Sequence, residues 1–260
     1  MTLTPTQMSC VEFGRELIRT ADLDPLYTIL DAAQLDHDLL GRFLLAYGMY
    51  YSAGVSAHIA EADDFWGTAA ALIPTAPRGT ERRHFRGGLA HKSIAFGASL
   101  GAPEEALKLI YPGEGPLTFA QVYKGAQRLH GFGSWISFKM ADIADRTRYR
   151  TVDFAGCELS IYRTPVQGSA LWRYGDEHAK IASHEVGEVC EEVRLAVGPD
   201  LLAPPLYDRP INIQEVETVL CKFHSHKHGH YPLGKDTREI LHGLHGWGPL
   251  ADRLAACPLL

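Results

Sequence analysis

The sequence lacks the segments that mark membrane, secreted and metal-cluster proteins. No apolar run in the 260 residues approaches the length that crosses a membrane. The N-terminus has no basic segment followed by an apolar core, so neither secretion nor a membrane anchor is expected. The five cysteines are widely scattered and never form Cys-x-x-Cys, which excludes an iron–sulfur loop and indicates reduced thiols.

Strand patterns and an overall basic charge are also missing. Helical spacing of apolar residues runs almost throughout, which predicts an all-α fold in a single domain over residues 1–260. The net charge of −6 argues against a protein that coats nucleic acid nonspecifically. Positive charge is concentrated locally, however: residues 78–92 carry five Lys or Arg against one acid, Glu81, and residues 124–150 carry six against two. This asymmetry favours a polyanion as partner.

A tight glycine bend lies between two helical runs. Gly131 and Gly133 flank one apolar residue and allow the chain to reverse, which predicts a helical hairpin over residues 118–146. The second helix, expected over residues 134–146, would present uncapped amides that can hold an anion such as a DNA phosphate. Asp153 follows twenty residues after Gly133.

Local signals predict the elements around this bend. Residues 11–45 are expected to be helical, residues 154–162 helical, residues 164–175 irregular and residues 178–197 an amphipathic helix. Residues 77–88 are expected to form a loop whose arginines are either solvated or bind phosphate. His184-Glu185-x-x-Glu188 lacks the second histidine of a zinc protease, so a solvated helix face is expected there.

Residues 211–240 form a C-terminal cassette. Asn212 and Glu215 make a capping box that starts a helix, with Lys222, Ser225 and His226 expected on the face away from the core. Gly229 is a natural residue to end this helix, and Asp236 is expected to cap the next one. Lys222, Ser225, His226, Lys235 and the loop amides would together suit a phosphate or pyrophosphate.

Histidines alternate at positions 224, 226, 228 and 230. Cys221, His224 and His228 have spacings that one helix face can bring together, but no second half-site of clear spacing accompanies them. The sequence therefore favours a cationic, proton-exchanging surface, and no metal ligands are expected.

Two resemblances to known families rest on these motifs. The hairpin followed by Asp153 resembles the helix-hairpin-helix DNA glycosylases, whose hairpin grips backbone phosphate and whose later Asp lies in the pocket for a flipped base. Trp135 stands where bifunctional members carry a nucleophilic Lys, so Schiff-base lyase chemistry is not implied. The cassette Cys-Lys-x-x-Ser-His-x-x-Gly-His-Tyr-Pro-Leu-Gly-Lys-Asp resembles the phage α-glutamyl/putrescinyl-thymine pyrophosphorylases, also described as amino acid:DNA transferases. Earlier stretches match too, so this resemblance covers residues 22–240.

The second resemblance implies a fold and a reaction. The fold would be glycosylase-like, with two helical lobes around a cleft. The substrate would be 5-pyrophosphorylmethyl-uracil in double-stranded phage DNA, where an amine, with glycine expected first or else a polyamine, displaces pyrophosphate. The protein would work in the cytoplasm of the infected bacterium, without a membrane partner. No cofactor is implied except Mg²⁺, which could help to neutralise the leaving pyrophosphate.

The resemblance also implies residue roles. Asp153 would be the base or the amine anchor, with His226 or His230 as alternates, and it could instead simply cap a helix. The implied catalytic residues are Asp153, His226, Lys222 and Lys235; the pyrophosphate-binding residues are Arg82, Arg83, Arg86, Ser225 and His230; and the DNA-binding residues are Gly131, Gly133, Lys139 and Arg146.

Two other classes of protein stay open at this point. A monofunctional glycosylase would also use Asp153, to support attack of water on the sugar. A noncatalytic DNA-binding module would need only the hairpin and the basic stretch.

Overall fold

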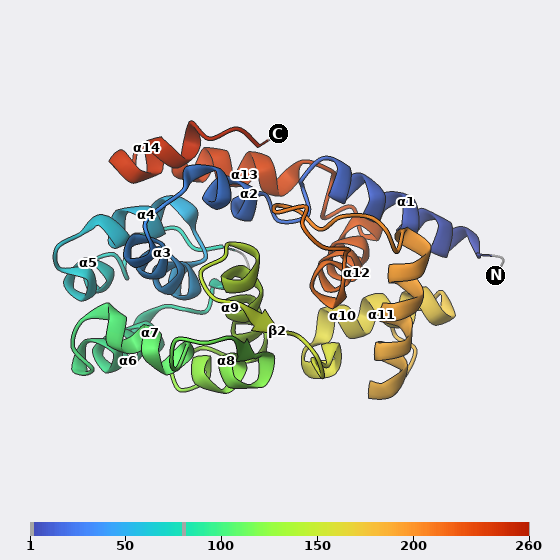
Figure 1. Cartoon of the computed structure of the whole chain (residues 1–260), viewed down its shortest axis with the longest axis horizontal. Coiled ribbons are helices and arrows are strands. Elements are labelled where there is room, and N and C mark those ends of the chain that lie inside the picture. Colours follow the sequence, from blue (N-terminus) through green and yellow to red (C-terminus); the bar gives the residue numbers. More distant parts are fainter. Residues whose placement is uncertain (1–2, 80–81, 260) are drawn as a thin grey trace. The chain divides into compact units, whose positions relative to one another are not determined.

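The structure is a computed structural model that describes residues 3–79 and 82–259, so Glu81 of the basic stretch lies outside it. The described chain is helical apart from short strands and turns, which confirms the all-α prediction (Figure 1). In chain order the elements are α1 (Pro5–Arg19), α2 (Pro25–Ala33), α3 (His37–Tyr50), α4 (Ala53–Glu61), α5 (Phe65–Ala71), α6 (Gly87–Ser99), α7 (Pro103–Ile110), β1 (Leu117–Thr118), α8 (Phe119–Ala126), α9 (Ser134–Arg146), β2 (Val152–Asp153), the 3₁₀ turn η2 (Leu159–Ile161), α10 (Arg163–Tyr174), α11 (Ser183–Val197), α12 (Ile213–Lys227), α13 (Lys235–Leu244) and α14 (Pro249–Ala255).

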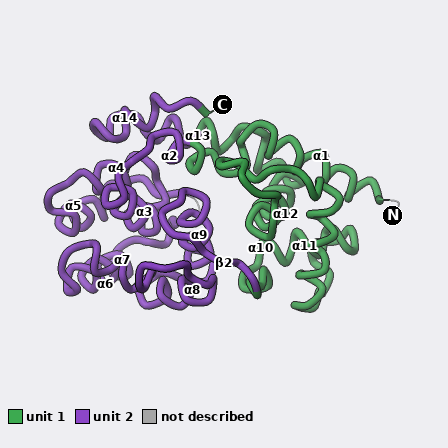
Figure 2. The backbone as a smooth tube through the Cα atoms, in the orientation of Figure 1, with its two compact units in different colours: residues 1–28, 156–238, 259–260 green, residues 29–155, 239–258 purple. Residues whose placement is uncertain are grey.

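The chain divides into two compact units (Figure 2). Unit 1 consists of residues 1–28, 156–238 and 259–260, and unit 2 of residues 29–155 and 239–258. Each unit is therefore built from segments that are distant in the sequence. No described helix is long and apolar enough to cross a membrane.

Unit 1 is organised around α12. This helix packs against α1, α10 and α11, and buries Val216, Val219, Leu220 and Phe223 completely or nearly so. The contact with α10 is close because Gly168 has no side chain: a Cβ there would lie 2.6 Å from the carbonyl oxygen of Leu220. A residue larger than glycine would therefore force the two helices apart.

Unit 2 contains the glycine hairpin. Helices α8 and α9 pack on each other, α3 packs on α4, α7 and α9, and β1 pairs in parallel with β2 through Leu117↔Val152 and Thr118↔Asp153. The α9 bounds match the predicted second helix of the hairpin, and Gly131 has a φ of 80°, the left-handed conformation that glycine adopts without strain. The bend of the hairpin is thus made as the sequence predicts.

Two sequence predictions for unit 1 are wrong. Residues 164–175 were expected to be irregular, but α10 occupies most of them; Pro165 lies in its first turn, where no helical N–H is needed, and the helix buries Leu171 and Trp172. Residues 154–162 were expected to be helical, but only the short turn η2 forms there. Tertiary burial outweighs the local signals in both places.

The capping predictions in the cassette have mixed outcomes. The Asn212–Glu215 capping box is confirmed: Asn212 Oδ1 accepts the Gln214 amide at 2.8 Å, and Glu215 Oε2 accepts the Asn212 amide at 2.9 Å. Gly229 ends the helix with a φ of 71°. Asp236 does not cap α13, because it is the second residue inside that helix.

Candidate functional site

The basic stretch and the hairpin of unit 2 are joined by Arg82. This residue is 1% exposed, and its guanidinium donates to the carbonyl oxygen of Gly131 at 2.7 Å and to that of Met49 at 3.2 Å. The group also lies over the rings of Phe85 and Phe132, at 4.6 and 5.4 Å from their centroids. Burial lowers the pKa of Arg82 to about 10, so the side chain stays charged at neutral pH. In this position Arg82 fixes the hairpin bend.

The two other predicted arginines are presented to solvent. Arg83 and Arg86 are exposed, and Arg86 precedes α6, whose first residues Gly87 and Gly88 lie in open space. The side chain of Leu89 lies against Gly131, and the ring of Phe96 meets that of His130 edge-on at 5.6 Å between centroids. The start of α6 and the hairpin therefore form one continuous surface of unit 2, with Arg82 beneath it.

The structure places Lys139 and Arg146 in the interior of unit 2. Lys139 Nζ lies 3.2 Å from Asp142 Oδ2, and Arg146 lies 3.7 Å from Asp142 Oδ1. Lys139 and Arg146 are 7% and 3% exposed, and Asp142 is fully buried. These cations balance a buried carboxylate within α9, as a buried charge requires, and the surface that meets solvent is formed by Gly131 and Gly133 instead.

An aromatic pair adjoins the hairpin. The ring of Trp135, in the first turn of α9, meets that of Tyr51 edge-on at 4.7 Å between centroids, and both side chains are half-buried. Tyr51 ends α3 in the left-handed conformation, with a φ of 50°. Gly133, the N-cap of α9, offers no side chain to bond the first amides of that helix. The uncapped amides at the start of α9 suit a phosphate, and the neighbouring rings of Trp135 and Tyr51 suit a nucleic-acid base.

Asp153 is an exposed residue of β2 in unit 2. Its Oδ1 accepts the amide of Ala155 at 2.8 Å, which leaves the rest of the carboxylate facing solvent. The preceding amide, that of Val152, donates to Asp145 Oδ1 at 3.0 Å and is thereby tied to α9. The strand that carries Asp153 is thus attached to α9 through the amide of Val152. The carboxylate of Asp153 bonds a turn amide and does not cap a helix.

In unit 1, Lys222 is the centre of a polar network. The sequence predicted this side chain on the outer face of α12, but it is buried, 8% exposed. Lys222 Nζ donates to the carbonyl oxygen of Asp22 and to the hydroxyl of Tyr231, both at 2.6 Å, and forms an ion pair with Asp236 at 2.7 Å. These three contacts use all three ammonium hydrogens.

Asp22 completes this network and was missed by the sequence. Its buried carboxylate accepts the amide of Gly234 at 2.6 Å and the hydroxyl of Thr237 at 2.9 Å, so it holds the start of α13 where Asp236 was expected to do so. Burial and the carboxylates of Asp236 and Asp22 raise the pKa of Tyr231 far above its usual range. No local pattern marks Asp22 because its partners lie two hundred or more positions later in the chain.

The same network orients His226. The Nδ1 atom lies 2.8 Å from the carbonyl oxygen of Tyr231, and the ring stacks on Phe13 at 4.5 Å between centroids. A carbonyl can only accept a hydrogen bond, so Nδ1 carries the proton of the neutral ring and Nε2 is the basic nitrogen. His226 is therefore held in one tautomer and one orientation.

The remaining cassette residues lie in the last turn of α12 and in the segment up to the start of α13. Lys235 Nζ donates to the carbonyl oxygen of His230 at 3.1 Å, and the amide of His230 donates to the carbonyl oxygen of Ser225 at 2.9 Å. Lys222, Ser225, His226, His230 and Lys235 thus belong to one part of unit 1, whereas Asp153, Gly131, Gly133 and the arginines belong to unit 2.

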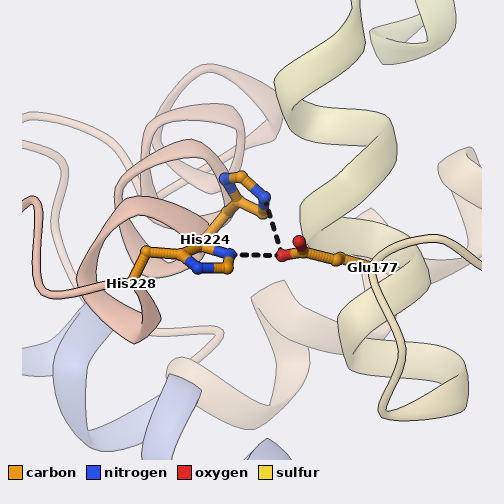
Figure 3. A group of neighbouring side chains, drawn as sticks. All are labelled: Glu177, His224 and His228. Carbon is orange, nitrogen blue, oxygen red and sulfur yellow. Dashed lines mark hydrogen bonds and ion pairs between the residues drawn. The ribbon is translucent and has the colours of Figure 1, made fainter.

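A second group in unit 1 involves a residue that the sequence did not single out. Glu177, between α10 and α11, lies against His224 of α12 and against His228, the C-cap residue of that helix (Figure 3). Burial lowers the pKa of His224. The hydrogen bond from His228 and the nearby charges of His224 and His178 lower the pKa of Glu177. Sequence reasoning found the two histidines but could not find the carboxylate, which comes from a distant segment.

Comparisons with known proteins agree with the second resemblance. The family model described as amino acid:DNA transferase matches residues 20–231. A protein named glycinyltransferase from Pseudomonas phage PaMx11 is 34% identical over 280 residues, which cover 96% of this chain and 94% of that protein. A protein named putrescinyltransferase from Delftia phage PhiW-14 is 27% identical over 256 residues, covering 94% and 81%.

These matches place the chain among the DNA-modifying transferases that use amino acids or amines. It belongs to the amino acid:DNA transferase family. The kinship with helix-hairpin-helix glycosylases, including two lobes around a cleft, stays a prediction.

Proposed function

We propose that this protein attaches an amine, with glycine the first candidate, to 5-pyrophosphorylmethyl-uracil in double-stranded phage DNA and releases pyrophosphate. The observation that carries the choice of glycine is the 34% identity, over nearly the whole of both chains, to the protein named glycinyltransferase. The putrescinyltransferase relative, at 27% identity, makes a polyamine the second candidate. The reaction takes place in the infected bacterial cell.

Unit 2 supplies the grip on DNA in this proposal. The uncapped start of α9 at Gly133 and the exposed Arg83 and Arg86 offer amides and guanidinium groups to backbone phosphates. Tyr51 and Trp135 offer rings on which a base that has left the helical stack can rest. The buried Arg82 holds the hairpin in place through its hydrogen bonds to the carbonyl oxygens of Gly131 and Met49.

The cassette of unit 1 supplies the chemistry. The donor amine loses a proton to Nε2 of His226, the amine nitrogen forms a bond to the exocyclic carbon of the base, and the bond from that carbon to pyrophosphate breaks with its electron pair leaving on the pyrophosphate oxygen. Lys235 and Ser225 neutralise the charge that develops on the leaving group. In this proposal Asp153 binds the ammonium group of the donor, or takes that proton in place of His226.

The support for His226 as the base is its fixed orientation. The bond from Nδ1 to the carbonyl oxygen of Tyr231 and the stacking on Phe13 leave Nε2 as the proton acceptor. A positioned base of this kind contributes about 10²- to 10⁴-fold to a rate. Mg²⁺ could share the charge of pyrophosphate without altering this role.

The direct test incubates the purified protein with DNA that carries pyrophosphorylated thymine and with a panel of amines. Digestion to nucleosides and mass spectrometry would then reveal the product. We expect one amine, glycine first, to give a mass-shifted nucleoside. Unchanged nucleosides with every amine, with and without Mg²⁺, would rule the proposal out, and release of free base would point to a glycosylase.

Variants separate the base from the DNA grip. His226→Gln should lower turnover by about 10²-fold or more while DNA affinity is retained. His184→Gln, an exposed histidine of α11, is the matched control and should behave as wild type. Asp153→Asn should also abolish turnover with DNA affinity intact; unaltered activity would remove Asp153 from the mechanism.

A further inference from the structure

Glu177, His224 and His228 converge on one point in unit 1 (Figure 3). His224 lies in the last turn of α12, and His228, four positions later, is the C-cap residue of that helix, so the two rings lie on the same side of its end. Their Nε2 atoms lie 2.9 and 2.5 Å from the same oxygen, Oε2 of Glu177. All three ligand atoms lie within 4.8 Å of one another, which is close to the spacing that a shared metal ion requires.

Hydrogen bonding accounts for only one side of this arrangement, the contact between Nε2 of His228 and Oε2 of Glu177. The buried Nε2 of His224 makes no hydrogen bond within the described part of the chain, although it lies 2.9 Å from the Glu177 carboxylate. A buried nitrogen aimed at an oxygen without a bonding angle is an unsatisfied group, which folded proteins rarely leave. A cation placed between the three ligand atoms would satisfy the nitrogen and the carboxylate together.

The surroundings also favour a built site. The side chains of Glu177 and His224 are only 16% exposed, while that of His228 is 43% exposed. The other carboxylate oxygen, Oε1, lies 3.3 Å from Nε2 of His178 and is thereby steadied from outside. Such an outer contact orients a ligating carboxylate. The partly exposed side chain of His228 leaves a path by which an ion can reach the three ligand atoms from solvent.

We propose that Glu177, His224 and His228 bind one divalent transition-metal ion of the Zn²⁺ type, with the remaining position open to water or another small ligand. Two imidazole nitrogens and one carboxylate oxygen suit Zn²⁺ and its neighbours, whereas Mg²⁺ and Ca²⁺ take oxygen ligands almost exclusively. The ion ties the segment between α10 and α11 to the end of α12, two residues beyond His226. This inference does not depend on the proposed reaction.

The test uses the full-length protein after treatment with EDTA. Calorimetric titration with ZnCl₂ should give one equivalent, and CoCl₂ should produce the strong visible absorption of a low-symmetry site with imidazole ligands. MgCl₂ should neither bind there nor compete. Zn²⁺ should also raise the melting temperature, because it binds the folded chain in preference to the unfolded one.

Single variants make the assignment specific. Glu177→Gln and His228→Gln should each weaken Zn²⁺ binding by roughly 100-fold and abolish the cobalt absorption. Circular dichroism would verify folding, and the partly exposed His228 is the substitution expected to disturb the fold least. His184→Gln should bind Zn²⁺ as wild type does. Absence of Zn²⁺ binding by the wild type, or equal binding by wild type and both ligand variants, would overturn the proposal.

Discussion

Lys222 carries its ammonium group within hydrogen-bond distance of Asp22, Tyr231 and Asp236, and these contacts leave it no hydrogen for a substrate. The side chain acts by holding the loop that follows α12, and with it the carbonyl oxygen that orients His226. A positive charge in the cassette is therefore not enough to identify a residue that would bind pyrophosphate, because a lysine such as Lys222 can instead hold the loop in place.

We predict different losses for the two cassette lysines. Lys222→Met should lower the free energy of unfolding by about 3 kcal/mol, because it leaves the carbonyl oxygen of Asp22, the hydroxyl of Tyr231 and the carboxylate of Asp236 without their cation. Lys235→Met should change the free energy of unfolding by less than about 1 kcal/mol and reduce turnover instead. Urea denaturation and the nucleoside assay on both variants measure this contrast; equal stability losses would contradict it.

Cys10 provides a pH-dependent prediction. Its thiol is fully buried in α1, and burial raises its pKa to about 12. The thiol of the unfolded chain ionises from about pH 8.5, so above that pH the unfolded state binds fewer protons and stability falls until the folded thiol also ionises. The contribution of Cys10 should drop by roughly 2 kcal/mol between pH 8.5 and pH 10.

Comparison with variants isolates this effect. Cys10→Ala should flatten the decline of unfolding free energy with pH, as measured by urea denaturation at each pH. Cys257→Ala, whose thiol is only partly buried, is the control and should flatten it less. A decline that is equally steep in Cys10→Ala and wild type would show that another group is responsible.

At the scale of elements, the hairpin and α6 depend on one buried arginine. Arg82→Met would leave the carbonyl oxygens of Gly131 and Met49 without donors, which should cost about 3 kcal/mol of unfolding free energy. Because the hairpin bend would then loosen, DNA affinity should fall as well.

Arg83 is the matched surface position. Arg83→Ala should leave stability within about 0.5 kcal/mol of wild type, weaken DNA binding, and reduce the slope of log affinity against log salt by about 1, as expected for one lost phosphate contact. Fluorescence anisotropy with labelled duplex DNA over a salt series measures both variants. An unchanged salt slope for Arg83→Ala would remove this arginine from the DNA surface.

The elements that the sequence predicts well are those with local signals. The bend at Gly131, the helix from Ser134 to Arg146 and the capping box at Asn212 are determined within a few residues, and all three appear in the structure. The helix α10 was not predicted because Pro165 and Gly168 weaken its local pattern, and its stability comes from burial against α12.

The candidate site is less predictable for the same physical reason. Arg82, Lys139 and Arg146 look like surface cations in the sequence, yet each is buried against partners that only the fold supplies. Asp22 and Glu177 reach their partners across long stretches of chain and carry no local pattern at all. The motif residues themselves, such as His226 and Asp153, could be chosen from the resemblance.

At the scale of the whole molecule, family membership, the surface of unit 2 that we propose binds phosphate and the oriented histidine of unit 1 all bear on the proposed reaction. The reaction that we propose requires a grip on the duplex, a base for the incoming amine and stabilisation of the departing pyrophosphate. The chain carries residues suited to each of these tasks, distributed over its two compact units.

The most direct measurement counts two products in one reaction on DNA containing pyrophosphorylated thymine. Isotope-labelled glycine incorporated into nucleosides and inorganic pyrophosphate released into solution would be quantified over time. We predict equal molar amounts of the two at every time point, with both reduced at least 10²-fold in His226→Gln. Pyrophosphate release without glycine incorporation, or incorporation without release, would contradict it.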